Sequence, residues 1–122
     1  MKIGNFDLNK DGVYIIAELS ANHNGSLQTA LDTIKAAKEI GANAIKLQTY
    51  RADTITLNSK NEDFLIGGGT LWDGKNLYEL YEQAYTPWEW HKELFDYARS
   101  INIDIFSTPF DKSAVDFLEQ FN

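Results

Sequence analysis

The stretch VYIIAELSANHNGSLQTALDTIKAAKEIGANAIKLQTY, residues 13–50, contains a strand, a helix and a second strand in that order. Its β-branched and aromatic start predicts a strand over 13–19, and residues 43–50 predict another. Between them, Ser26 is typical of a helix N-cap and Gly41 of a helix end. The two strands start about 31 residues apart, the spacing of a βαβ unit with parallel strands.

The same alternation continues further along the chain. NIDIFST, residues 102–108, predicts a third strand, and Asp111 predicts the cap of a helix after it. Before that strand, the series Thr86, Pro87 and Glu89 has the pattern of a capping box, which predicts that a helix starts there. Alternating strands and helices favour an α/β fold with a parallel sheet.

Two segments fall outside this alternation. Residues 1–12 are expected to be an N-terminal extension or a short strand, and residues 51–86 an insertion after the second strand. The insertion includes a short helix over 76–85 and the glycine-rich run GGGTLWDG, for which a flexible lid is favoured over a phosphate loop. Loops that follow strands emerge at the carboxyl edge of the sheet, where α/β enzymes keep their active sites.

Three parallel strands leave exposed edges, and the last helix stops at Asn122 without a C-cap. We therefore expect the N-terminal portion of a (β/α)8 TIM barrel, truncated after about three βα units. No cysteine is present, so disulfides are excluded, and the net charge of −7 argues against a nucleic-acid or anionic-membrane partner. With no signal peptide and no long apolar run, a cytoplasmic protein is expected.

Charged and polar side chains interrupt two strands that should be apolar on both faces. Lys46 and Gln48 share one face of the second strand by period-two alternation, and Glu18 lies in the first strand. A buried charge needs a partner or a ligand. Glu18 and Lys46 could form a structural pair, Lys46 could be a Schiff-base nucleophile, or it could bind phosphate or carboxylate. The residues alone leave these alternatives open.

Other polar residues lie near the same edge. Ser107 and Thr108 could donate hydrogen bonds to an anion, or they could simply end the strand. His23 is predicted in a loop at the active-site edge, and His91 in a helix, on its surface or in its packing. Two histidines far apart in sequence make a metal site built from this chain alone unexpected. The insertion's aromatic residues are predicted to pack as one cluster: Trp72, Tyr78, Tyr81, Trp88 and Trp90.

Three motifs together resemble a known family. AELSANHNGSL (17–27), GANAIKLQTY (41–50) and STPFD (107–111), in this order and spacing, are similar to the N-terminal part of the sialic acid synthase family. The insertion resembles the branch of that family that makes pseudaminic acid. The resemblance covers essentially the whole chain.

The resemblance implies a nonulosonic acid synthase that condenses phosphoenolpyruvate with a 2,4-diacetamido-2,4,6-trideoxy hexose, giving pseudaminic acid and phosphate. The methylene carbon of phosphoenolpyruvate attacks the aldehyde, and water adds to the resulting oxocarbenium carbon before phosphate leaves by C–O cleavage. N-acetylneuraminate or legionaminate are the alternative products. A Schiff-base aldolase and a non-catalytic sugar-binding module are alternatives of other classes.

By position, the resemblance assigns Lys46 to phosphoenolpyruvate, Thr108 to its carboxylate, and Glu18 to the aldehyde and a metal-bound water. Gln48, Ser107 and Asn22 complete the expected substrate-binding set. A divalent metal (Mn, Mg or Co) is expected in the full-length enzyme, with ligands outside this chain. The family's C-terminal antifreeze-like domain, which acts across a homodimer, is also absent, so the 122-residue chain alone is expected to be inactive.

Overall fold

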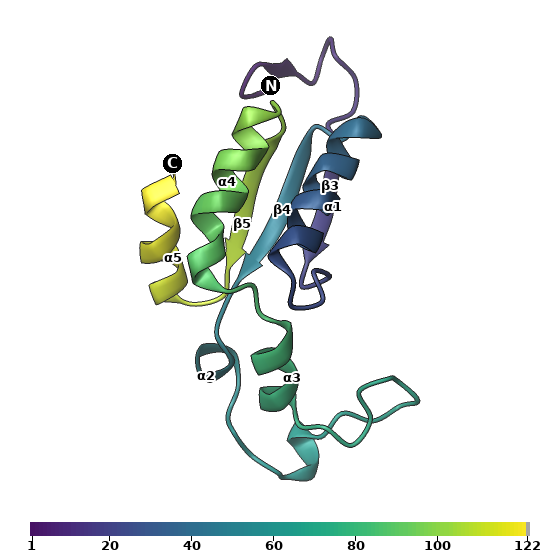
Figure 1. Cartoon of the computed structure of the whole chain (residues 1–122), viewed down its shortest axis with the longest axis vertical. Helices are drawn as coiled ribbons and strands as arrows, with labels where there is room; N and C mark the ends of the chain where they lie inside the picture. The colour runs from purple at the N-terminus through teal and green to yellow at the C-terminus, as the bar shows by residue number, and fades with distance from the viewer. Residues whose placement is uncertain (122) are drawn as a thin grey trace.

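A computed structural model describes residues 1–121 of the chain. Its centre is a parallel sheet with the strand order β3-β4-β5, made of β3 (Ile16–Ser20), β4 (Ala44–Thr49) and β5 (Asp104–Pro109) (Figure 1). The predicted strands and their parallel pairing are confirmed, although β3 and β5 start later than predicted. The fold is therefore α/β with a parallel three-stranded sheet.

Helices cover one face of this sheet. α1 (Leu27–Glu39) and α4 (His91–Ser100) lie side by side across the strands, and α5 (Lys112–Leu118) lies beyond α4 (Figure 1). The core between sheet and helices is apolar, and its fully buried members include Leu19, Ala30, Ile34, Ile45, Leu47, Leu94 and Ala98. No helix among residues 1–121 is long and apolar enough to cross a membrane.

The ends of α1 follow from the sequence. Ser26 Oγ accepts a hydrogen bond from the Thr29 amide at 3.2 Å, as an N-cap does. At the other end Gly41 has a φ of 91°, a left-handed conformation that favours glycine. Its amide and that of Ala42 bond back to carbonyls in the last turn of the helix. Asp111 caps α5 in the same way as Ser26 caps α1, so both predicted caps are confirmed.

The predicted capping box at Thr86 is wrong. Pro87 is not helical, with ψ at 130°, and a 3-10 turn, η2 (Trp88–Trp90), precedes α4. The Thr86 hydroxyl is buried and finds no hydrogen-bond partner among the described residues. Packing sets the start of this helix instead, because Trp88 stacks on Phe117 at a centroid distance of 4.5 Å.

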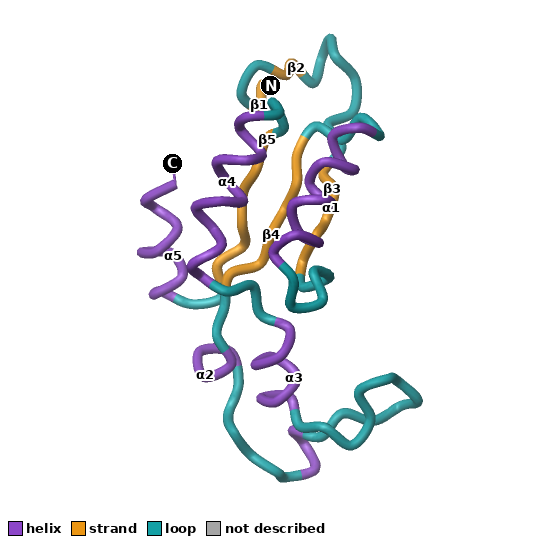
Figure 2. Tube along the Cα trace, in the orientation of Figure 1, coloured by secondary structure: helices purple, strands orange, loops and turns teal. Residues whose placement is uncertain are grey.

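The insertion extends beyond the carboxyl ends of the strands (Figure 2). It contains α2 (Ala52–Ile55), the 3-10 turn η1 (Glu62–Phe64) and α3 (Leu77–Ala84), the last of which matches the predicted short helix. Its aromatic residues do not form the single predicted cluster. They pack separately against other parts of the chain, as in the pairs Tyr81–Tyr50, Trp88–Phe117 and Trp90–His23.

The N-terminal segment forms a small hairpin of its own. β1 (Lys2–Ile3) and β2 (Phe6–Asp7) pair antiparallel and do not join the main sheet. Figure 1 shows the hairpin beyond the amino ends of the strands. The Phe6 ring packs edge-on against Tyr14, centroids 5.2 Å apart, which holds the hairpin away from the carboxyl edge where the candidate site lies.

Candidate active site

The two faces of β4 carry different side chains, as its alternation predicts. Ile45, Leu47 and Thr49 are buried toward the helices, whereas Lys46 and Gln48 lie on the other face. The register of the neighbouring strands β3 and β5 places one polar residue of each on the same face as Lys46 and Gln48. Glu18 of β3 is paired with Lys46, and Thr108 of β5 is paired with Gln48. We call this face, which no helix of the described chain covers, the open face.

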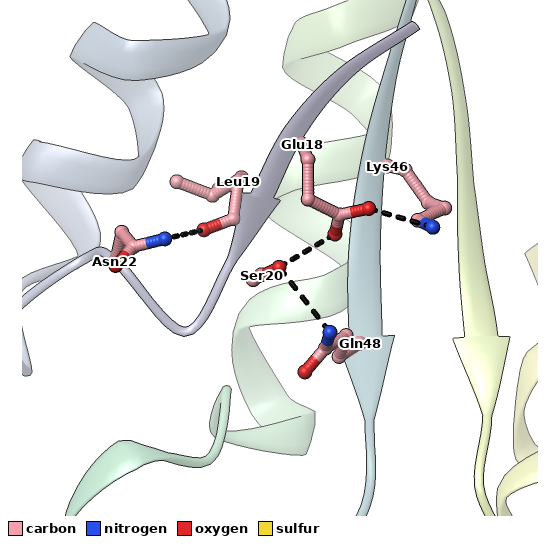
Figure 3. Close-up of polar contacts among 6 residues, drawn as sticks. All are labelled: Glu18, Leu19, Ser20, Asn22, Lys46 and Gln48. Carbon is pink, nitrogen blue, oxygen red and sulfur yellow. Dashed lines mark hydrogen bonds and ion pairs between the residues drawn. The ribbon is translucent and has the colours of Figure 1, made fainter.

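Lys46 and Glu18 form an ion pair on the open face. Lys46 Nζ lies 2.6 Å from Glu18 Oε2, and the two side chains are 33% and 39% exposed (Figure 3). Burial alone would raise the pKa of Glu18, but hydrogen bonds from Lys46 and Ser20 outweigh it and lower that pKa. Glu18 is therefore an ionised carboxylate near neutral pH, and its negative charge lies next to the positive charge of Lys46.

Ser20 links this pair to Gln48. The β3–β4 register shifts between Glu18 and Ser20, and Ser20 has a φ of 50°. The Ser20 hydroxyl donates to Glu18 Oε1 at 2.7 Å and accepts from Gln48 Nε2 at 3.2 Å (Figure 3). Sequence reasoning missed this residue, because a serine at a strand end is typical of an ordinary turn and no sequence signal marks the shift in register.

Ser107 lies on the helix side of the sheet and is not brought together with the predicted site residues. Its register partner is Leu47, and its hydroxyl lies 2.7 Å from Thr49 Oγ1. Thr108, by contrast, is exposed on the open face next to Gln48. Period-two alternation separates adjacent residues in this way, so only Thr108 can take part in the same site as Lys46.

A buried polar chain lies behind Thr108. Thr49 Oγ1 is 2.7 Å from His91 Nε2, and His91 Nδ1 is 3.2 Å from the Pro87 carbonyl oxygen. A carbonyl oxygen can only accept a hydrogen bond, so His91 Nδ1 carries the proton. His91 Nε2 therefore accepts a hydrogen bond from the Thr49 hydroxyl, and the Thr49 hydroxyl accepts one from Ser107. We call Ser107, Thr49 and His91 the buried relay. It joins the ends of β4 and β5 to the start of α4.

His91 is fully buried, so the part of its prediction that allowed a surface position is wrong and the packing alternative is confirmed. A sequence signal for this existed, because His91, Leu94, Phe95 and Ala98 follow helical spacing and all are buried. Burial also lowers the pKa of His91, against the opposing effect of the Pro87 and Trp88 carbonyls. The relay therefore holds a neutral imidazole.

The loop after β3 positions Asn22 and His23 apart from the ion pair. Asn22 Nδ2 donates to the Leu19 carbonyl at 3.1 Å, and Figure 3 shows Asn22 on the other side of β3 from Glu18 and Lys46. His23 is buried, with Nδ1 accepting from the Gly25 amide at 3.1 Å and its ring edge-on to Trp90. Its burial lowers its pKa. His23 thus packs the loop rather than presenting a free imidazole at the edge.

No group of three or more His, Cys, Asp or Glu side chains among residues 1–121 could hold a metal ion. The residues of the open face therefore offer an ammonium, a carboxylate, an amide and a hydroxyl. Such a set can bind an anion at Lys46 and orient a polar molecule next to Glu18.

Comparison with known proteins places this geometry in a family. The sequence profile of the NeuB family matches residues 33–122. The chain is 59% identical over 122 residues to a pseudaminic acid synthase of Campylobacter jejuni, covering all of this chain and 35% of that protein. It is 55% identical over 108 residues to the pseudaminic acid synthase of Helicobacter pylori, covering 88% of this chain and 32% of that protein. This chain thus spans about a third of the length of these curated relatives.

More distant relatives agree. An N,N'-diacetyllegionaminic acid synthase of Legionella pneumophila is 39% identical over 105 residues, 86% of this chain and 29% of that protein. The crystal structure of an N-acetylneuraminic acid synthetase from Leptospira borgpetersenii superposes with a TM-score of 0.75 at 27% identity, over all of this chain and 38% of that one. The resemblance to sialic acid synthases is confirmed: the chain belongs to the NeuB family.

Proposed function

We propose that this chain is part of a phosphoenolpyruvate-dependent synthase that makes pseudaminic acid. The observation that carries the proposal is the Lys46–Glu18 ion pair on the open face, flanked by Gln48 and Thr108, in a chain 55–59% identical to pseudaminic acid synthases. The substrates are phosphoenolpyruvate and a 2,4-diacetamido-2,4,6-trideoxy hexose in its open-chain aldehyde form.

The architecture that fits this function is a closed barrel. In this proposal the three parallel strands, with helices on one face only, would be three βα units of a (β/α)8 barrel whose interior is the open face. The exposed apolar side chains Ile16 and Phe106 on that face would be covered by the other strands. In such a barrel Lys46, Gln48 and Thr108 point into the interior near its carboxyl end.

The reaction forms a C–C bond and a C–O bond to water, and it breaks the C–O bond to phosphate. The methylene carbon of phosphoenolpyruvate attacks the aldehyde carbon, whose oxygen becomes a hydroxyl by taking a proton. Water then adds to the oxocarbenium carbon, forming a new C–O bond and losing one proton. The phosphate then leaves with the electrons of its own C–O bond and takes the proton of the remaining hydroxyl as that C–O becomes the keto group. In this proposal Lys46 holds the anionic phosphoenolpyruvate, Thr108 donates to its carboxylate, and the Glu18 carboxylate orients the water and accepts its proton.

A Schiff-base aldolase fits the geometry less well. A lysine nucleophile must react as a neutral amine, whereas Lys46 is bound to the carboxylate of Glu18 at 2.6 Å. Borohydride treatment of the full-length protein with pyruvate distinguishes the two functions. A covalent adduct on Lys46 would establish the aldolase, and no adduct is expected for the synthase.

A divalent metal such as Mn, Mg or Co, when bound, would polarise the sugar aldehyde. The described residues do not supply a ligand set for it, so its ligands would come from other parts of the full-length protein. We also propose that the full-length protein is a homodimer.

The test is an assay of the full-length polypeptide with phosphoenolpyruvate and a panel of acetamido sugars. Phosphate release with 2,4-diacetamido-2,4,6-trideoxy-altrose, and much less with the legionaminate precursor or N-acetylmannosamine, is expected. Faster phosphate release with the legionaminate precursor would make the protein a legionaminate synthase, and faster release with N-acetylmannosamine would make it an N-acetylneuraminate synthase. No release with any sugar, at full metal supplementation, would contradict the proposal.

A further inference from the structure

The last residue of β3 lies at a break in the strand register. Up to Glu18, the residues of β3 pair one by one with those of β4, and Glu18 lies level with Lys46. Without a break, this order would place Ser20 level with Gln48, but the register shifts and Ser20 lies level with Leu47. From there its hydroxyl reaches side chains of both strands. Irregularities of this kind next to active sites re-aim a side chain.

The backbone at this break has a conformation that serine seldom adopts. Ser20 has a φ of 50°, in the left-handed region that favours glycine. Its neighbours hold it there, because Leu19 is buried in the core and the Leu19 carbonyl accepts from the amide of Asn22 at 2.9 Å and from its Nδ2 at 3.1 Å. Such strained positions cluster at functional sites. A serine here, in place of a glycine, points to a role for its hydroxyl.

The hydrogen bonds of this hydroxyl have a fixed direction. An ionised carboxylate can only accept, so the single hydroxyl proton of Ser20 goes to Glu18 Oε1. The Ser20 oxygen is then the acceptor for Gln48 Nε2. This bond sets the orientation of the Gln48 amide, whose nitrogen faces Ser20 while its oxygen points away from it (Figure 3). One hydroxyl thus orients a carboxylate and an amide at once.

The two oxygens of Glu18 have different partners. Oε2 is paired with the Lys46 ammonium, and Oε1 accepts from the neutral Ser20 hydroxyl. In the proposed reaction Lys46 also binds the anionic phosphoenolpyruvate, so its attraction to Glu18 is shared with the substrate. The bond from Ser20 carries no charge that the substrate would compete for. It favours the ionised form of Glu18 and gives this carboxylate a partner that stays in place when the substrate is bound.

We infer that Ser20 is a positioning residue, whose hydroxyl, aimed by the break in register, keeps the Glu18 carboxylate and the Gln48 amide oriented toward the bound substrate. The inference rests on the proposed function, in which Glu18 accepts a proton from water. Ser20 acts through these two side chains and is assigned no contact with the reacting atoms.

The experiment compares two variants of the full-length protein. Ser20→Gly removes the hydroxyl, and glycine adopts a φ of 50° without strain, so a loss of activity cannot come from the backbone conformation. We expect kcat to fall about tenfold, since a hydrogen bond to a charged group contributes about that factor, with little change in the KM for phosphoenolpyruvate. Ala21→Gly is the matched control, because it loosens the same turn but keeps the hydroxyl, and its kcat should stay near that of the wild type.

The acid limb of the kcat profile gives a second readout. Burial raises the pKa of Glu18, and the bonds from Lys46 and Ser20 lower it. Both variants retain Lys46, the charged group that acts on Glu18 among the described residues. Loss of the Ser20 bond should therefore raise this pKa and move the acid limb to higher pH in Ser20→Gly, but not in Ala21→Gly. An unchanged kcat in Ser20→Gly, or an equal fall in Ala21→Gly, would overturn the inference.

The same pKa can be measured without turnover. Carbon NMR of the full-length protein, labelled at its glutamate carboxyl carbons, follows the titration of Glu18, whose signal is the one missing in Glu18→Gln. The pKa of Glu18 should be higher in Ser20→Gly than in the wild type or in Ala21→Gly, and equal values in all three would overturn the inference. If no sugar gives phosphate release, the proposed function fails, whereas this titration still decides whether Ser20 holds Glu18.

Discussion

Lys46 Nζ and Glu18 Oε2 lie 2.6 Å apart, on neighbouring parallel strands at paired register positions. Each side chain remains about a third exposed on a face that no helix of the described chain covers. This face would become the interior of the proposed barrel, where Gln48 and Thr108 lie beside the pair. The geometry places an ammonium and a carboxylate where a ligand can reach them.

Replacing Lys46 by Met should therefore affect activity far more than folding. In the full-length enzyme we expect kcat/KM for phosphoenolpyruvate to fall about 10²-fold or more, because an anion-stabilising group is lost. The thermal midpoint should change by only a few degrees. Lys46→Arg keeps the charge and serves as the control, and it should retain more activity than Lys46→Met. A large loss of stability with little loss of activity would favour a structural pair.

Ser107 and Thr108 should differ in what they affect, although they are adjacent. Thr108 lies on the open face, so Thr108→Ala is expected to raise the KM for phosphoenolpyruvate about tenfold. Ser107 bonds Thr49 behind the sheet, so Ser107→Ala should lower stability by about 1 kcal/mol and leave that KM nearly unchanged. Steady-state kinetics and thermal melts of both full-length variants measure this. A raised KM in Ser107→Ala would restore Ser107 to the substrate set.

This contrast shows where sequence reasoning succeeds. The period-two pattern correctly predicted that Lys46 and Gln48 share a face, because residue alternation in a strand is geometric. The same rule separates Ser107 from Thr108, so only one of these two expected substrate-binding residues lies on the face of Lys46. Ser20 could not be predicted, because its role depends on a register shift and a φ of 50° that only the folded strand pair defines.

The helix start at α4 shows a second limit. Thr86, Pro87 and Glu89 satisfy the local capping rules, but tertiary contacts of Trp88 and His91 determine where the helix begins. The same local rules succeeded at the start of α1, where the Ser26 side chain caps the helix by accepting from the Thr29 amide. Local pattern thus predicts the sheet and most helix ends, whereas the neighbours of each site residue require the structure.

The buried relay should make stability depend on pH through His91. Burial lowers the pKa of His91 below its ordinary value of about 6.5, so the unfolded chain binds a proton at a higher pH than the folded chain does. Stability from this group is complete above about pH 6.5 and is lost as the pH falls from there through the lowered pKa. Thermal melts of the full-length protein from pH 7.5 to 5.5 should show this decline.

His91→Gln is the control for this dependence, since a glutamine amide can donate to Pro87 and accept from Thr49 without titrating. Its melting temperature should fall less steeply with acid than that of the wild type. His23, whose pKa is also lowered by burial, titrates in both proteins and so cancels in the comparison. His91→Leu should cost about 1–3 kcal/mol at pH 7.5, because Thr49 loses its acceptor. Parallel pH profiles for wild type and His91→Gln would rule out His91 as the titrating group.

A polypeptide limited to residues 1–122 is expected to release no phosphate from phosphoenolpyruvate. On its open face Ile16 is 46% exposed and Phe106 is 39% exposed. No part of the described chain therefore encloses a substrate bound by Lys46. No set of side chains among residues 1–121 could hold the metal, and losing one such stabilising group costs about 10²-fold or more in rate. The measurement is phosphate release by this polypeptide and by the full-length protein, each with Mn, Mg or Co and the diacetamido sugar. Metal-dependent turnover by residues 1–122 alone would require a complete active site within them, and the assignment of Lys46 and Glu18 as one part of a larger site would then be wrong.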